Sequence, residues 1–395
     1  MISFYYSPDF CAGSFRSQSL VNALLKNKKF KKIIVFTTQP QRYGHMKNIK
    51  KIEKHNNLVI YRFYTPEHNN KFYKQCICYL FFFIKCIIYG IKNSKNIDGI
   101  FATSSRFGTA FLGFLMSIFL RKNYALDIRD VFSDNLQSLK FSKNWFGSTI
   151  IKIFSNLEKM IVKKTKWLNF VSPGFYNYTH LNPKNKSISL FTNGIDEIFI
   201  KNRNSRKNFS PHPFSDPLII TYAGNIGYGQ GLEKTVIKIA KHFKNKIQFK
   251  LIGDGSSVKL IKNEISNYNL SNILILKPVK RFELLKFYNE SDILFLQLNN
   301  VSAFENVLPS KIFDYGSFEK PILAGVSGVA KDFLCKNLPH SYIYDPDNYD
   351  EAINMINKII NNQNIRINNN KFVEDFNREQ IMEKMVNSFY PDLFQ

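Results

Sequence analysis

Short apolar runs recur along the first half of the chain, and polar or turn-forming residues separate them. The runs cover residues 2–6, 32–37, 58–61, 99–103, 124–128 and 167–171. Runs of this length that are rich in Ile, Val, Phe and Tyr predict buried β-strands, and the helical stretches between several of them predict crossover connections. This alternation is typical of an α/β domain built on a doubly wound parallel sheet.

The same alternation restarts after a polar segment, residues 201–217, which is rich in Asn, Ser, Lys and Pro. Strand-like runs follow at 218–223, 249–252, 273–276, 293–297 and 322–324. We therefore expect two Rossmann-like domains, 1–198 and 218–380, joined by a linker at 199–217 and facing a central cleft. Residues 381–395 are predicted to form a C-terminal helix, for which a return to the first domain is one option.

One apolar stretch, residues 76–89, is rich in aromatic residues, contains Lys85 and is flanked by Lys74 and Lys92. It is too short and too charged to cross a bilayer comfortably, since a spanning helix needs about 20 apolar residues. Two interpretations stay open. The stretch is a helix that lies in the membrane interface, with its lysines at the headgroups, or it is a buried helix of the first domain. A second run, 111–120, is predicted to be a crossover helix in the core.

Charge is distributed unevenly. The chain has 395 residues and a net charge of +25, and residues 1–195 hold 30 Lys and Arg against 8 Asp and Glu, whereas residues 196–395 hold 25 against 22. Such a surplus in one half indicates an anionic partner, which could be membrane phospholipid, a lipid diphosphate or nucleic acid. A compositional bias of an AT-rich genome towards lysine codons is the alternative explanation.

The cysteines and the N-terminus bear on the compartment. Five cysteines form no Cys-x-x-Cys pair and no Cys/His cluster at zinc spacing, so the sequence predicts neither a disulfide framework nor a metal site. The first residues lack a basic segment and are predicted to form a strand, not a secretory signal. We expect a protein of a reducing, cytoplasmic compartment.

The segment from Leu308 to Tyr315 carries the most specific chemistry. Pro309 suits the first position of a helix, so the amides around Leu308 and Ser310 would face an anion such as a diphosphate. Lys311 adds a positive charge. Asp314, on the same helical face, would accept hydrogen bonds from ribose hydroxyls. The alternative is an ordinary amphipathic helix with a surface Lys and Asp.

Several segments together resemble glycosyltransferase family 4, whose members are retaining, metal-independent enzymes with the GT-B fold. In the second half they are residues 222–232, 252–255, 288–293 and 309–315, and in the first half residues 10–16, 127–130 and 192–196. The resemblance covers most of the chain. It is strongest to the branch that builds bacterial surface polysaccharides, including fucosaminyl- and colanic-acid-type transferases.

This resemblance implies a hexosyltransferase that moves a sugar, such as an N-acetylated amino or deoxy sugar, from a nucleotide donor to a polyprenyl-diphosphate-linked glycan of capsule or O-antigen. It implies a peripheral enzyme on the inner face of the cell membrane, with no cofactor, and a uridine nucleotide is expected over a guanosine nucleotide. Two alternatives are a GT-B nucleotide-sugar epimerase or hydrolase and a nucleic-acid-binding protein. The latter is disfavoured because no recognisable nucleic-acid motif is present.

The residues at matching positions receive expected roles. Asp130 ends a predicted strand at the edge where open α/β sheets bind ligands, and we expect it to be catalytic together with Lys311. Arg16 and Arg129 are expected to bind the acceptor, and Asp127 is interpreted as a structural acid. The expected donor-binding residues are Gly13, Asn225, Gly227, Gln230, Gly253, Val279, Lys280, Asn306, Val307, Leu308, Pro309, Ser310, Lys311 and Asp314.

The chain departs from the family pattern at two places. Asn225 and Gln230 stand where many members have an Arg and a Lys, which leaves Lys311 as the main predicted cation for the diphosphate. Asn306 replaces the first acid of a pair eight positions apart, and Asp314 is the second.

Overall fold

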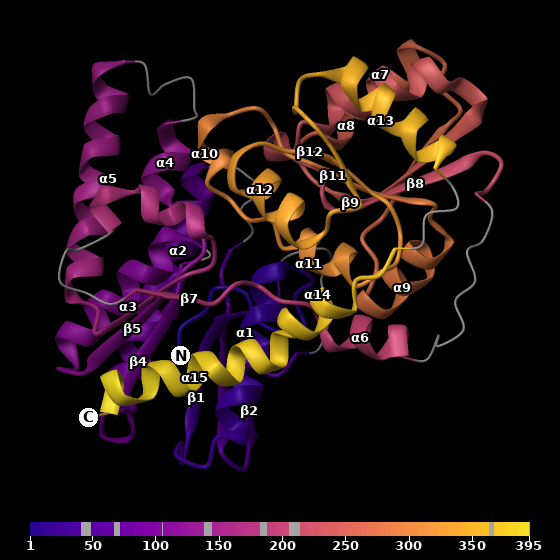
Figure 1. Cartoon of the computed structure of the whole chain (residues 1–395). Helices are drawn as coiled ribbons and strands as arrows, with labels where there is room; N and C mark the ends of the chain where they lie inside the picture. The colour runs from indigo at the N-terminus through magenta and orange to yellow at the C-terminus, as the bar shows by residue number, and fades with distance from the viewer. Residues whose placement is uncertain are drawn as a thin grey trace. The chain divides into compact units, whose positions relative to one another are not determined.

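The computed structural model describes residues 1–40, 49–66, 72–104, 106–137, 144–181, 188–204, 214–362 and 367–394. The chain divides into two compact units (Figure 1). The first unit comprises Met1–Asn193 and Glu379–Gln395, and the second comprises Gly194–Arg378. The C-terminal segment therefore packs with the first unit.

The first unit is built on parallel strands. A four-stranded group has the order β4 (Gly99–Thr103), β5 (Asn123–Ile128), β6 (Trp167–Phe170) and β7 (Ile188–Leu190), and a three-stranded group has the order β1 (Ile33–Thr38), β3 (Leu58–Phe63) and β2 (Ile52–His55). Only β2 runs antiparallel to its neighbour. The predicted strand at residues 2–6 is reduced to bridges of Ile2 with Phe36 and Ala102, which join the two groups. That prediction was wrong in extent, because the backbone turns at Tyr6, whose carbonyl accepts from the N–H of Asp9.

Helices cover this sheet. They are α1 (Ala12–Lys26), α2 (Phe72–Lys92), α3 (Phe107–Phe119), α4 (Phe132–Gln137) and α5 (Trp145–Lys164), with the short 3₁₀ turns η1 (Ser94–Asn96), η3 (Pro173–Asn177) and η4 (Thr179–Leu181). The last helix, α15 (Arg378–Phe394), packs Phe389 against the rings of Phe101 and Trp167, with centroids 5.2 and 5.4 Å away. Burial of these rings supplies the apolar contact that holds α15 to the first unit.

The second unit has one six-stranded parallel sheet. Its order is β10 (Ile273–Leu276), β9 (Ile247–Asp254), β8 (Leu218–Asn225), β11 (Ile293–Gln297), β12 (Ile322–Gly325) and β13 (Ser341–Tyr344). Apart from β13, each strand was predicted at nearly the observed position. The order changes direction at β8, which is the arrangement of a doubly wound sheet.

Two apolar cores lie against this sheet, and helices pack on both of its sides (Figure 1). Buried side chains of α7 (Leu232–Phe243), α8 (Val258–Asn267) and α13 (Tyr349–Asn361) form one core. The other core includes α6 (Glu197–Asn204), α9 (Arg281–Glu290), α11 (Lys311–Gly316), α12 (Gly328–Asn337) and α14 (Asn370–Asp375). The remaining short elements are the 3₁₀ turns η5 (Tyr228–Gln230) and η6 (Lys244–Lys246) and the short helix α10 (Ser302–Glu305).

The region predicted as a linker, 199–217, begins as helix α6. Phe199 is buried in the second core, so the start of this region belongs to the second unit and not to a solvated connection. Residues 205–213 lie outside the described part of the chain.

Candidate functional site

Two glycine turns meet at the carboxyl ends of β8 and β9. The parallel register places Gly224 beside Gly253 and Asn225 beside Asp254, and the N–H of Ile226 donates to the carbonyl of Asp254 at 2.9 Å. Gly253 has φ of +154°, and a Cβ there would lie 1.8 Å from the carbonyl oxygen of Gly224. Only glycine permits this approach. The turns lie at the sheet edge where doubly wound domains bind ligands.

Lys311 brings a positive charge to these turns. Its Nζ lies 4.8 Å from the centroid of the Tyr222 ring, and a Cβ built on Gly224 would be only 2.7 Å from that Nζ. A side chain at position 224 would therefore displace the ammonium group. Since Lys311 reaches from α11 to the end of β8, it places a cation beside backbone that a phosphate could approach closely.

The start of α11 differs from the prediction. The helix begins at Lys311 with Ser310 as its N-cap, so Pro309 does not occupy the first helical position. The N–H of Ile312 donates to the carbonyl of Pro309 and that of Phe313 to Ser310, which tightens the turn into 3₁₀ geometry. Leu308 is buried in the apolar core, so its side chain does not face a ligand.

Asn225 and Gln230 hydrogen-bond to each other. The Asn225 amide Nδ2 donates to Gln230 Oε1 at 2.9 Å, and the backbone N–H of Gly227 donates to the same oxygen at 3.2 Å. The pair thus braces the loop between β8 and α7. Neutral side chains therefore fix the shape of this loop.

Asp314 forms an ion pair within the second unit. Both its carboxylate oxygens accept from the guanidinium of Arg281, at 2.9 and 2.7 Å, and the residue is only 5% exposed. Its role in holding ribose hydroxyls stays a prediction. Sequence reasoning missed Arg281, which carries no recognisable motif.

Arg281 belongs to a longer chain of charges. Its Nε also donates to Asp196 at 3.1 Å, and Asp196 accepts from Arg378 at 3.0 Å, whose other nitrogen donates to the carbonyl of Gly194. Burial alone would raise the pKa of Asp196, but the two arginines hold it below its usual value. Burial likewise opposes the charge of Arg281, yet Asp314 and Asp196 raise its pKa. We call Asp314, Arg281, Asp196 and Arg378 the charge chain. The charge chain connects α11 to Asp196 and Arg378, which lie near the first and last residues of the second unit.

The backbone groups of Lys280 form hydrogen bonds at the start of α9, and its donor-binding role stays a prediction. Its N–H donates to Glu283 Oε2 at 2.7 Å, and its carbonyl accepts from the N–H groups of Glu283 and Leu284. These bonds cap α9. Val279 packs against the second core. Asn306 and Val307, which follow α10, are half-buried, and their donor roles stay predictions.

In the first unit, Arg16 is buried and fully engaged. Its Nε and Nη2 donate to the two oxygens of Asp127 at 2.8 and 3.0 Å, and other donors reach the carbonyls of Phe191 and Thr192. Asn169 donates to Asp127 as well, at 2.7 Å. The Arg16 side chain therefore joins α1 to the ends of β5 and β7, and its acceptor-binding role stays a prediction.

Arg129 and Asp130 follow β5 at the same sheet edge. Asp130 is exposed. The Nε and Nη1 atoms of Arg129 are buried and have no hydrogen-bond partner within the described part of the chain. Burial, and then the charge of Arg16, lower the pKa of Arg129. A buried cation with unsatisfied donors is a suitable place for an anion. Gly13 lies in the first turn of α1.

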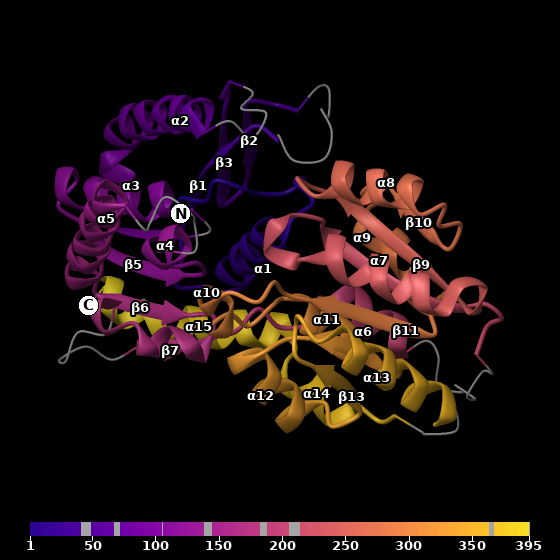
Figure 2. The same cartoon turned by 90° about the horizontal axis from the view of Figure 1, so that it is seen from above.

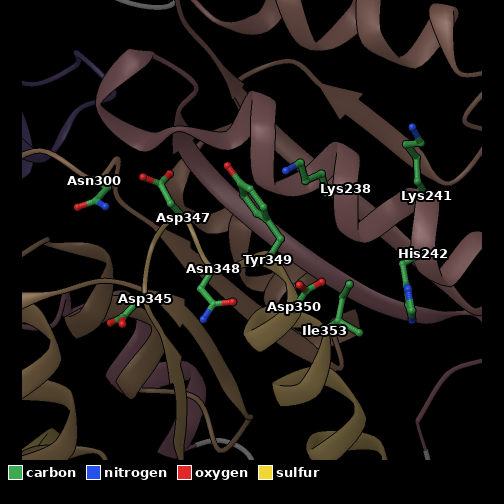
Figure 3. A pocket seen from close by; sticks show the side chains of 10 residues that line it. All are labelled: Lys238, Lys241, His242, Asn300, Asp345, Asp347, Asn348, Tyr349, Asp350 and Ile353. Atoms are coloured by element: carbon green, nitrogen blue, oxygen red, sulfur yellow. The ribbon is translucent and has the colours of Figure 1, made fainter.

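A separate cavity of about 600 Å³ lies between α7 and the start of α13 (Figure 3). Its lining is Lys238, Lys241, His242, Asn300, Asp345, Asp347, Asn348, Tyr349, Asp350 and Ile353. Lys238 Nζ lies over the Tyr349 ring at 3.8 Å, while Lys241 and Asp345 lie far apart in this view. The polar groups do not converge on one centre, so we place the functional site at the glycine turns and Lys311.

Comparison with known proteins relates the second unit to one family. Residues 204–375 match the family described as glycosyl transferases group 1, whereas no curated protein matches the chain. Sucrose-phosphate synthase from Thermosynechococcus elongatus aligns with a TM-score of 0.70 at 15% identity, over 99% of this chain and 95% of that one.

Two further structures have the same fold. Anabaena Alr3699/HepE in complex with UDP and glucose aligns with a TM-score of 0.69 at 12% identity, over 99% of both chains. The lipopolysaccharide outer core galactosyltransferase WaaB aligns with a TM-score of 0.59 at 13% identity, again over 99% of both. The predicted α/β fold, with two Rossmann-like GT-B domains, is confirmed.

Proposed function

We propose that this chain is a retaining glycosyltransferase of family 4 that transfers a sugar from a UDP-sugar to a polyprenyl-diphosphate-linked glycan. Its GT-B fold and the match of residues 204–375 to glycosyl transferases group 1 support the proposal. The glycan would belong to a bacterial surface polysaccharide such as capsule or O-antigen. The observation that carries the proposal is Lys311, whose ammonium group lies beside the glycine turns of the unit that matches the transferase family. Alr3699/HepE, which shares the fold, has been solved with UDP and with UDP-glucose.

The donor site has one chief task in this chemistry. The bond between the sugar C1 and the diphosphate oxygen breaks, its electron pair stays on that oxygen, and negative charge develops on the leaving group. Lys311 supplies a cation for that charge, and Gly224 and Gly253 let the backbone approach the phosphates. The braced loop of Asn225 and Gln230 keeps this geometry in place before the donor binds, so little reorganisation is needed.

The acceptor hydroxyl then forms the new bond to C1 on the face that the leaving group vacates, and its proton leaves to a base. We assign that base to Asp130, which is exposed at the ligand-binding edge of the first unit. The unsatisfied donors of Arg129, one residue earlier, would hold a phosphate of the acceptor. An acceptor of this kind places the enzyme at the cytoplasmic face of the membrane.

The donor site can be tested by thermal shift with UDP, UDP-glucose, GDP, ADP and dTDP, on wild type and on Lys311→Ala. We expect the uridine nucleotides to raise the melting temperature of wild type, because a ligand that binds only the folded state stabilises it. The variant should lose most of this shift and lose transfer at least about a hundredfold.

Lys336→Ala is the matched control, since Lys336 is an exposed lysine near the end of α12 in the same unit. It should behave as wild type. A Lys311→Ala protein with the normal nucleotide shift and normal transfer would refute the donor site. The anomeric configuration of the product, read by NMR, separately tests retention.

A further inference from the structure

Helix α2 exposes a continuous apolar stripe. Ile77, Leu80, Phe81, Ile84, Ile88 and Ile91 are each between 41% and 57% exposed. Their spacings of three and four residues place them along one side of the helix. Cys78, Phe82 and Cys86, on the other side, are buried. The helix therefore has two apolar sides, of which only one is covered by the protein.

This arrangement separates α2 from a core helix and from a spanning helix. The segment Lys74–Lys92 is long and apolar enough to cross a membrane, with mean hydropathy 1.5, but only 22% of it is buried. A core helix would be mostly buried. A spanning helix would be released from the sheet, whereas α2 packs on β1 and α3. The remaining possibility is a surface helix whose outer side is apolar.

The neighbouring helices extend this surface. Phe83 of α2 stacks on Phe111 of α3 at 6.2 Å, and Phe107 of α3 meets Phe154 of α5 edge-on at 5.0 Å. The three helices thus lie side by side (Figure 2). On α5, Phe146, Ile153 and Met160 recur every seven residues and are exposed, and Trp145 at its first turn is 79% exposed. Phe119 adds an exposed ring at the end of α3.

The charges on these helices have one sign. Lys85 and Lys92 of α2 and Lys152, Lys159, Lys163 and Lys164 of α5 are exposed. Helices α2 and α3 contain no acidic residue. The acid of α5, Glu158, is buried, where it accepts from the N–H of Phe132 at 2.8 Å and from His180 at 3.1 Å. The surface is therefore apolar and cationic, with no exposed carboxylate on its three helices.

We propose that the outer surface of α2, α3 and α5, here called the docking face, binds an anionic lipid bilayer. The apolar stripes would enter the boundary between headgroups and acyl chains, and the lysines would lie at the level of the phosphates. The absence of exposed acid on these helices argues for an anionic partner, and the continuous apolar rows argue for a hydrocarbon surface. The inference deepens the proposed function, since it names the face that brings the enzyme to a lipid-linked acceptor.

The test measures binding of full-length protein to sedimented vesicles, in the absence of donor. Vesicles of phosphatidylglycerol and phosphatidylethanolamine are compared with vesicles of phosphatidylcholine. The variant Leu80→Gln/Ile84→Gln/Ile88→Gln makes the α2 stripe polar at exposed positions. The control Leu260→Gln/Tyr268→Gln/Leu274→Gln changes three residues of similar exposure in the second unit.

We expect wild type and the control to bind the anionic vesicles, and the α2 variant to partition at least about tenfold less. Binding to phosphatidylcholine should be weaker for all three proteins. Unchanged circular dichroism and melting temperature verify that the variant is folded. Lys85→Gln/Lys92→Gln should weaken binding at low salt and have less effect at high salt.

Equal vesicle binding by wild type and the folded α2 variant would overturn the proposal. A wild-type protein that does not bind anionic vesicles would also overturn it. Loss of self-association in the variant, without any vesicle binding, would identify the face as a protein interface instead. Failure of the donor site is distinguishable, because a wild type that binds vesicles but shows no shift with any nucleotide contradicts the proposed function alone.

Discussion

Removal of Arg281 should destabilise the second unit strongly. Arg281→Met keeps much of the aliphatic volume but removes three charge-assisted hydrogen bonds, at 2.7 and 2.9 Å to Asp314 and at 3.1 Å to Asp196. Asp314 then keeps a carboxylate that is nearly buried and has lost its arginine. Breaking a buried ion pair by removing one partner costs about 3–5 kcal/mol, mostly as the penalty for the charge that remains.

The assay is urea or thermal unfolding of the full chain, monitored by circular dichroism and calorimetry. In a unit of this size 1 kcal/mol corresponds to about 2–4 °C, so we expect the transition of the second unit to fall by roughly 6–20 °C. Lys201→Met is the control. It breaks the exposed pair with Glu197, whose side chains are 72% and 53% exposed, and should change stability by less than about 0.5 kcal/mol.

The dependence on pH gives a second readout. Because the arginines hold the pKa of Asp196 below its usual value in the folded state, its contribution to wild-type stability is present above the unfolded pKa and is lost as pH falls through the folded one. In Arg281→Met the Asp196 carboxylate loses one of its two arginines, so the difference from wild type should shrink as acid protonates Asp196. A cost below about 1 kcal/mol at neutral pH, or a cost that does not shrink in acid, would refute the reasoning.

Two other substitutions test the site directly. Gly253→Ala should abolish the nucleotide thermal shift and lower the free energy of unfolding by about 2 kcal/mol or more. The reason is that its Cβ would overlap the carbonyl of Gly224 at a positive φ. A variant with the normal thermal shift would contradict the close packing of the two glycine turns. Arg129→Met should leave stability unchanged or slightly raised, since it removes a buried cation without hydrogen-bond partners at Nε and Nη1 within the described chain. In kinetic assays it should raise the acceptor KM about tenfold and leave the donor KM unchanged, whereas a loss of stability of about 2 kcal/mol would show that Arg129 is structural.

The sequence alone was a good guide to the parallel sheets. Strands β4, β5, β10, β11 and β12 consist mainly of apolar residues and were readable from residue type. Strands β2, β7 and β13 were missed because each is short and has a polar residue within or beside its apolar positions. The strand predicted at residues 2–6 failed for another reason. Its apolar residues are buried, but the chain turns after a few hydrogen bonds.

The glycine turns and Lys311 could each be singled out from the sequence, because each belongs to a short local motif. Their donor-binding roles stay predictions. A glycine at a strand end and a lysine at a helix start act through local backbone geometry. The intramolecular partners of Arg16 and Asp314 were not predictable, because they lie far away in the sequence. Arg16 meets Asp127 111 positions away, and Asp314 meets Arg281 33 positions away.

The sequence by itself thus determined the fold class, the basic first half and the local motifs that contain the glycines and Lys311, since apolar periodicity, composition and short motifs encode these. Only the tertiary structure decided which charged side chains stay available to a ligand and which apolar side of α2 stays uncovered. A buried carboxylate binds whichever cation the packing brings within reach, and burial of one helix side depends on the sheet beneath it. The choice of ion-pair partner and the burial of a helix side therefore cannot be inferred from the residue or from its neighbours in the sequence.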